Sequence, residues 1–114
     1  MRQVRFVLAA ALSIGIASTA FARTEEELLE DASALLEPSA DTRDAVFACE
    51  NGECPEAVQI DARFEALVAD RQRLQAERNE LVGCDCAALD RVLADVKNIQ
   101  LDTQVVIVTW EMNQ

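Results

Sequence analysis

Cysteines are the residues of this 114-residue chain whose type and spacing have the clearest chemical meaning. They form two tight pairs, Cys49 with Cys54 and Cys84 with Cys86. In exported proteins such pairs oxidise to disulfides, whereas cytosolic thiols stay reduced and serve metal binding or catalysis. The compartment of the protein therefore decides which chemistry these side chains perform.

The first 22 residues have the three-part pattern of a secretory signal. Arg2 and Arg5 make its start positive, an apolar run covers residues 6–17, and it ends in the small-x-small sequence Ala-Phe-Ala. The apolar run is shorter than the about 20 residues that a membrane-spanning helix needs. We therefore expect cleavage after residue 22 and a periplasmic or secreted protein that has no membrane segment, with an uncleaved anchor as the alternative.

Residues 23–114 are long enough for a single small domain whose modest core benefits from covalent cross-links. The whole chain has 21 acidic and 10 basic residues and a net charge of −11. Loss of Arg2 and Arg5 with the signal would leave 8 basic residues and a net charge of −13. Such a charge repels nucleic acids and anionic lipids and favours a basic protein partner.

The apolar pattern predicts a mainly α fold, with a small α+β fold as the alternative. Thr24 and Glu27 have the spacing of a capping box and begin a helix over 25–36, which Pro38 would end. A long helix is expected over 56–82, because no Gly or Pro interrupts it. It would form an antiparallel helical hairpin with a shorter helix over the stretch 86–101.

Two further segments have β character. Residues 44–50 fit either a short strand or a helical turn, and Asn51-Gly52 favours a hairpin there. The β-branched run at 104–110 predicts a C-terminal strand, which would bring Trp110 back toward the first cysteine pair. A lone strand needs a partner, either within the chain, in a second copy or in another protein.

The long helix determines how the cysteines pair. Helix 56–82 would be roughly 40 Å long, with one cysteine pair at each end. A disulfide needs Cα atoms within about 7 Å of each other. The favoured pairing is therefore local, Cys49–Cys54 and Cys84–Cys86, and a kinked helix or an intermolecular bridge would overturn it.

The same separation bears on the other uses of the cysteines. A zinc site needs four sulfur atoms about 2.3 Å from one ion, which the long helix prevents. Redox chemistry at Cys84-Asp85-Cys86 is the stronger alternative, because a helix start stabilises a thiolate. The charge of Asp85 opposes that effect, so a structural cross-link is favoured.

Arg71 and Arg78 interrupt the coiled-coil spacing of helix 56–82 at two seam positions. They would either extend along the edge of the seam and pair with acids such as Asp70 or Glu77, or set the register or partner of a helix–helix contact. The first interpretation is favoured, because broad apolar stripes often include an arginine.

The composition argues against catalysis. The chain has no His and no Tyr, and residues 23–114 contain only Ser33 and Ser39 as serines, so the common nucleophile–base pairs are missing. No cofactor is expected. The sequence predicts an exported, acidic, disulfide-stabilised interaction or structural module, with a homodimer through helix 56–82 or strand 104–110 as an option. The alternatives are a thiol–disulfide redox protein and a cysteine-ligated metal-binding protein.

Overall fold

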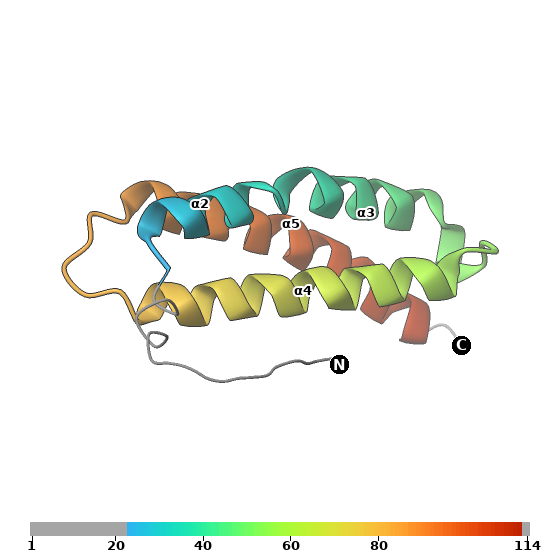
Figure 1. The fold of residues 1–114 in the computed structure, drawn as a ribbon. Helices are drawn as coiled ribbons and strands as arrows, with labels where there is room; N and C mark the ends of the chain where they lie inside the picture. Colours follow the sequence, from blue (N-terminus) through green and yellow to red (C-terminus); the bar gives the residue numbers. More distant parts are fainter. Residues whose placement is uncertain (1–22, 113–114) are drawn as a thin grey trace, which may run out of the picture.

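The computed structural model describes residues 23–112, in which every regular element is helical (Figure 1). In chain order these elements are α2 (Glu25–Ser33), α3 (Leu36–Ala48), the 3-10 helix η1 (Glu50–Gly52), α4 (Ala57–Asn79) and α5 (Ala87–Met112). α2 and α3 lie end to end as one rod, α4 runs back beside them, and α5 returns in the direction of the rod. The predicted signal and its cleavage site, residues 1–22, lie outside the described residues.

The mainly helical class and the hairpin of α4 and α5 are confirmed, but the C-terminal strand is wrong. Residues 104–110 continue α5, which ends at Met112. Strand preference amounts to about 1 kcal/mol or less per residue, so burial of a helix face overrides it. Buried residues recur along α5 with a 4-3 spacing: Leu89, Leu93, Val96, Gln100, Thr103, Ile107 and Trp110. This repeat keeps one face of a continuous helix against its neighbours.

Residues 44–48 belong to α3, Cys49 lies in a bend and Glu50 begins η1, so the β-hairpin prediction is also wrong. Asn51 and Gly52 still have the positive φ angles that this dipeptide favours in a tight turn, 56° and 75°. The turn joins two helices rather than two strands, because burial of one face of α3 continues to its C-cap residue, Cys49. Trp110 packs against Gly52, so it lies near the first cysteine pair as predicted, although on a helix.

The predicted helix 25–36 is confirmed at its start and wrong at its end. The Glu27 amide donates to Thr24 Oγ1 at 3.2 Å and the Thr24 amide donates to Glu27 Oε1 at 2.9 Å, which completes the capping box. The helix is interrupted between Ser33 and Leu36, before Pro38, which lies in the first turn of α3. Proline is tolerated there because its missing N–H would have no acceptor within the helix.

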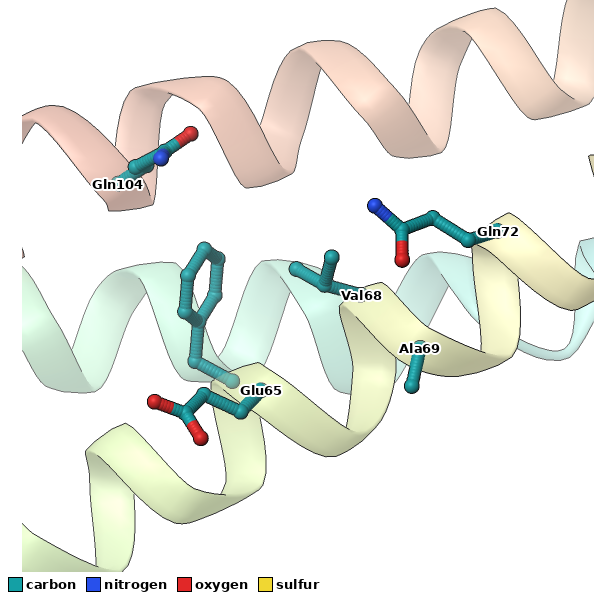
Figure 2. A pocket seen from close by; sticks show the side chains of 6 residues that line it. Glu65, Val68, Ala69, Gln72 and Gln104 are labelled. Carbon is teal, nitrogen blue, oxygen red and sulfur yellow. The ribbon is translucent and has the colours of Figure 1, made fainter.

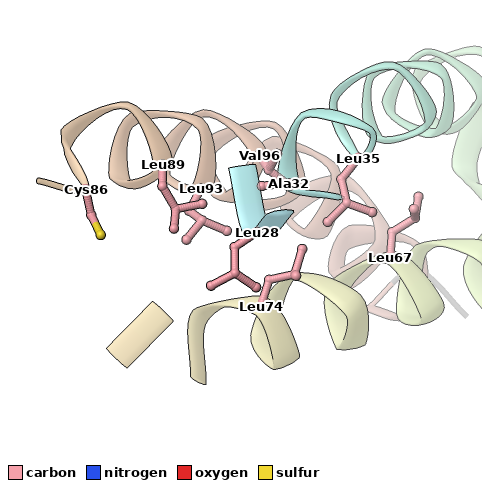
Figure 3. Close-up of a cluster of buried hydrophobic side chains, with 9 residues drawn as sticks. All are labelled: Leu28, Ala32, Leu35, Leu67, Leu74, Cys86, Leu89, Leu93 and Val96. Carbon is pink, nitrogen blue, oxygen red and sulfur yellow. The ribbon is translucent and has the colours of Figure 1, made fainter. Parts of the chain in front are cut away.

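The core consists of two apolar clusters, one toward each end of the bundle. The first joins α2 to the adjoining halves of α4 and α5 (Figure 3). The second surrounds Trp110 and comprises Val46, Cys49, Ile60, Phe64, Ile107 and Trp110. A fully buried aliphatic or aromatic side chain contributes about 1.5–3 kcal/mol, so these clusters supply most of the favourable energy of folding.

The segment between α4 and α5 contains the second cysteine pair. α4 ends at Asn79 rather than near residue 82, and α5 begins at Ala87. Gly83 has a positive φ of 75°, which glycine adopts without strain. No helix within residues 23–112 is long and apolar enough to cross a membrane.

Candidate functional site

Both cysteine pairs form disulfides, with the local pairing that the sequence predicted. The Cα atoms of Cys49 and Cys54 are 5.2 Å apart, and those of Cys84 and Cys86 are 5.3 Å apart. α4 separates the two disulfides, which lie in the connections at its opposite ends. Within residues 23–112 no three His, Cys, Asp or Glu side chains are grouped to hold a metal ion. The four sulfur atoms do not converge on one position, as a four-coordinate zinc ion requires.

The Cys49–Cys54 disulfide closes the turn between α3 and α4. Cys49 is buried in the second cluster, and the Cys54 amide donates to Cys49 Sγ at 3.3 Å. Inside the loop, a Cβ atom on Gly52 would lie 2.9 Å from Trp110 Cγ. The loop backbone therefore packs directly on the indole ring, and the disulfide holds that close approach in place.

The Cys84–Cys86 disulfide has two unequally accessible halves. Cys86 is 3 % exposed, belongs to the first cluster and immediately precedes α5 (Figure 3). Its carbonyl accepts the Asp90 amide at 2.8 Å, which begins the helical hydrogen-bond pattern. Cys84 is half-buried, and Asp85 between the two cysteines is exposed. An external thiol would therefore meet Cys84 first.

A polar layer between the two clusters contains Arg71. The Arg71 Nε donates to Gln100 Oε1 at 2.7 Å, and Gln100 Nε2 donates to Ser39 Oγ at 3.4 Å. Gln100 is 4 % exposed and Ser39 is also buried. Burial lowers the pKa of the Arg71 guanidinium from its ordinary value. Three helices, α4, α5 and α3, are thus linked by one hydrogen-bonded chain.

Two threonines complete this layer, and their hydroxyls donate to carbonyls of their own helices. Thr42 Oγ1 donates to the Pro38 carbonyl at 2.8 Å, and Thr103 Oγ1 donates to the Ile99 carbonyl at 2.9 Å. Both hydroxyls are buried, and both are satisfied by the carbonyl four residues earlier. These hydrogen bonds offset the cost of removing the two hydroxyls from water.

Arg78, the second seam arginine, contacts α5 rather than the acids nearest to it in the sequence. Its Nε donates to Asp90 Oδ1 at 2.6 Å and its Nη2 donates to Asp90 Oδ2 at 3.1 Å. This bidentate pair raises the pKa of Arg78 and lowers the pKa of Asp90. Asp70 pairs with Arg73 instead. Both seam arginines therefore bridge α4 to α5.

Arg23 makes a further ion pair that the sequence did not indicate. Its guanidinium contacts Asp31 on α2, and its Nε lies 2.9 Å from Glu77 Oε1 on α4. The hydrogen bond to Glu77, which has the larger effect, and the one to Asp31 raise the pKa of Arg23. These contacts tie the residue that follows the predicted cleavage site to two helices.

The described surface has several open grooves. One of roughly 290 Å³ lies between α4 and α5 and is lined by Phe64, Glu65, Val68, Ala69, Gln72 and Gln104 (Figure 2). Glu65 is the only ionisable side chain in this lining. General acid–base catalysis needs positioned proton donors and acceptors around a substrate. This groove presents a single carboxylate, whereas a second open groove on α2 is lined by Glu26, Glu27, Leu29 and Glu30.

Two surface features, one on the α2–α3 rod and one on α5, were not predicted from the sequence, because each lies on the side of its helix opposite a buried repeat. The acidic face of the α2–α3 rod consists of exposed carboxylates on its outer side: Glu26, Glu30, Glu37, Asp41 and Asp44. The outer stripe of α5 consists of exposed residues with a 4-3 spacing: Ala94, Asn98, Leu101, Val105, Val108 and Met112. The sequence predicts both surfaces if the 4-3 repeat of buried positions is allowed to include polar residues such as Ser39 and Gln100.

Within the described chain, the cysteines and the seam arginines thus serve mainly to cross-link connections and to bridge helices. The disulfides fix the two connections, and the seam arginines join α4 to α5. Comparison of the chain with protein-family models, with curated proteins and with solved structures found no match.

Proposed function

We propose that this protein is an exported, disulfide-stabilised module that binds a basic protein partner without catalysing a reaction. The acidic face of the α2–α3 rod carries the proposal. Its five carboxylates follow one another along the outer side of two helices, about 27 Å from Glu26 to Asp44 at 1.5 Å per residue. A surface of this length and sign fits a basic helix or an extended basic segment.

The distribution of positive charge supports this proposal. Among residues 23–112, the guanidinium groups of Arg23, Arg43, Arg73 and Arg78 form ion pairs inside the chain. The carboxylates in these pairs are five: Asp31, Asp44, Asp70, Glu77 and Asp90. The other acidic residues of the described chain have no ion pair, so the surface keeps a large negative excess for a partner to neutralise.

The disulfides suit a binding module outside the cytosol. Each closes a connection at one end of α4, and together they restrict the unfolded chain. A stabilised scaffold of three helical rods presents the acidic face with little loss of conformational freedom on binding. The pattern of residues 1–22 supports export, and disulfide formation by the cysteines agrees with it.

The test is capture of partners from the native exported fraction, with and without reductant. In one variant Glu26, Glu30 and Glu37 are changed to Gln. A matched control changes the same number of exposed glutamates on or beside α4: Glu56, Glu65 and Glu80. We expect the partner to be lost with the first variant and retained with the second. Equal capture by both would contradict a role for the acidic face.

The unequal burial of Cys84 and Cys86 favours thiol–disulfide exchange as a second candidate function. A substrate thiolate would attack Cys84 Sγ, form a mixed disulfide and release Cys86 as a thiolate at the start of α5. The second thiolate of the substrate would then form its own disulfide and release Cys84. The substrate loses two electrons, and the Cys84–Cys86 disulfide gains them.

This candidate predicts different behaviour for the two single variants. Cys86→Ala leaves the accessible Cys84 free and should trap a mixed disulfide, which non-reducing mass spectrometry would detect. Cys84→Ala leaves only the buried Cys86 and should trap little. Inert thiols in both variants would reject the exchange function and leave a structural cross-link.

A further inference from the structure

The outer stripe of α5 is an apolar surface that the packing of residues 23–112 leaves exposed. The side chains of Leu101, Val105, Val108 and Met112 are 46, 66, 43 and 79 % exposed. They lie on the side of α5 opposite its buried repeat, which already covers the whole helix from Leu89 to Trp110. A second, exposed 4-3 repeat is the pattern of a helix that packs on two sides.

The stripe is also the least charged part of α5. No charged residue occurs between Asp102 and Glu111, although 27 % of the chain is charged. Two copies of a chain with a net charge of −11 repel each other at most orientations. This stripe is a surface on which two copies can meet with few opposed carboxylates.

We propose that the stripe binds the same stripe of a second copy, with the two α5 helices parallel. In coiled-coil notation, Asn98, Val105 and Met112 occupy a positions, and Ala94, Leu101 and Val108 occupy d positions. A β-branched residue at a with Leu at d favours two-stranded parallel pairing. An Asn at one a position, here Asn98, specifies the same arrangement because the two amides hydrogen-bond each other.

Charge complementarity selects the parallel orientation. In a parallel pair a g residue faces the e residue five positions later in the second copy. Lys97 is at g and Asp102 is at e, so the pair forms twice across the dimer, and both side chains are exposed and have no ion pair within residues 23–112. In the antiparallel register that matches the apolar residues, Asp102 faces Thr109 and Glu111 faces Gln104. That register gains no ion pair and leaves Asn98 without its counterpart. The antiparallel register that faces Leu101 with Val105 pairs Lys97 with Glu111, but it opposes the two Asp102 carboxylates and faces Asn98 with Val108.

The contact would be short, which sets the expected affinity. Residues 94–112 span about 27 Å, less than three heptads. Interfaces below about 1,200 Å² are mostly transient. The dimer should therefore dissociate on dilution into the micromolar range, and binding of the basic partner does not depend on it.

Sedimentation velocity of the full chain, purified as the cell processes it, tests the proposal over a range of concentrations. Wild type should change from monomer to dimer as its concentration rises. Val105→Glu should remain monomeric. The control is Val82→Glu, because Val82 is 96 % exposed in the connection between α4 and α5, at the far end of α5 from Val105, and this variant should dimerise normally. Far-UV circular dichroism checks that both variants remain helical.

A charge exchange tests the orientation. Lys97→Glu should weaken the dimer about tenfold, because two attractions become repulsions. The double variant Lys97→Glu with Asp102→Lys should restore wild-type affinity. A wild type that stays monomeric at all concentrations, a dimer unaffected by Val105→Glu, or a dimer insensitive to the charge variants would each overturn the parallel α5 pairing.

Discussion

Arg71 on α4 and Gln100 on α5 are joined by a 2.7 Å hydrogen bond in the polar layer that divides the core. Gln100 is almost fully buried, so its amide depends on Arg71 and Ser39 for partners. A shift of α5 by one residue would move Gln100 away from both. The bond therefore favours one register of the three helical rods over its alternatives.

Removal of Arg71 alone should destabilise the protein more than removal of the whole pair. Arg71→Met leaves Gln100 Oε1 buried without a donor and should lower the free energy of unfolding by about 1–3 kcal/mol. Arg71→Met with Gln100→Leu should recover most of that loss, as measured by urea unfolding. Arg63→Met, at an exposed position of α4, is the control. Additive losses in the double variant would show that the two side chains are not coupled.

Gly52 and Gly83 form a matched pair for testing how the first disulfide loop packs. Both have a φ of 75°, so an alanine costs about 1 kcal/mol of backbone strain at either position. Only at Gly52 would the new Cβ also approach Trp110, since nothing lies within 4 Å of a Cβ at Gly83. Gly52→Ala should therefore lose more stability than Gly83→Ala and change the fluorescence of Trp110. Equal losses with unchanged fluorescence would contradict the packing of the loop on the indole.

Asp90 should make stability depend on pH in the acid range. Its pKa is lowered in the folded protein by Arg78, from an ordinary value of 3.8. Its contribution is therefore present above pH 3.8 and is lost as the pH falls through the folded pKa. The free energy difference between wild type and Asp90→Asn should shrink below about pH 4. Asp95→Asn, which removes an exposed carboxylate of the same helix without an ion pair, is the matched control for the loss of one negative charge.

The two disulfides should differ in what their removal costs. Changing Cys49 and Cys54 to Ala should lower the free energy of unfolding by about 2 kcal/mol, because the closed loop is short. Changing Cys84 and Cys86 to Ala should cost less, since the loop is smaller still. Urea unfolding with mass mapping of the intact protein checks both values. A peptide that links Cys54 to Cys84 or Cys86 within one monomer would contradict the structure.

The local features of this fold were readable in the sequence, whereas its long-range repeat was not. The capping box at Thr24, the positive φ at Gly52 and the local cysteine pairs depend on neighbouring residues only. The C-terminal helix was mistaken for a strand because Gln100 and Thr103 interrupt its apolar repeat just before a β-branched run. Gln100 has its hydrogen-bond partners on other helices, and Thr103 has its partner in a carbonyl of its own helix. Neither partner is apparent from the apolar pattern.

The arginines show the same limit at the level of single contacts. Coiled-coil spacing identified Arg71 and Arg78 as seam residues, and both do contact α5. Their partners, Gln100 and Asp90, are 29 and 12 residues away, and spacing along one helix does not reveal them. The break before Pro38 was likewise hidden, because proline suits the first turn of a helix as well as the residue after one.

The most direct test of the proposed function is the salt dependence of binding to the partner captured from the exported fraction. If the acidic face recognises a basic protein, the captured partner should have a positive net charge. Its affinity should fall steeply between about 50 and 500 mM salt, because added ions screen exposed charges. A neutral or acidic partner whose affinity is unchanged over that range would contradict the account.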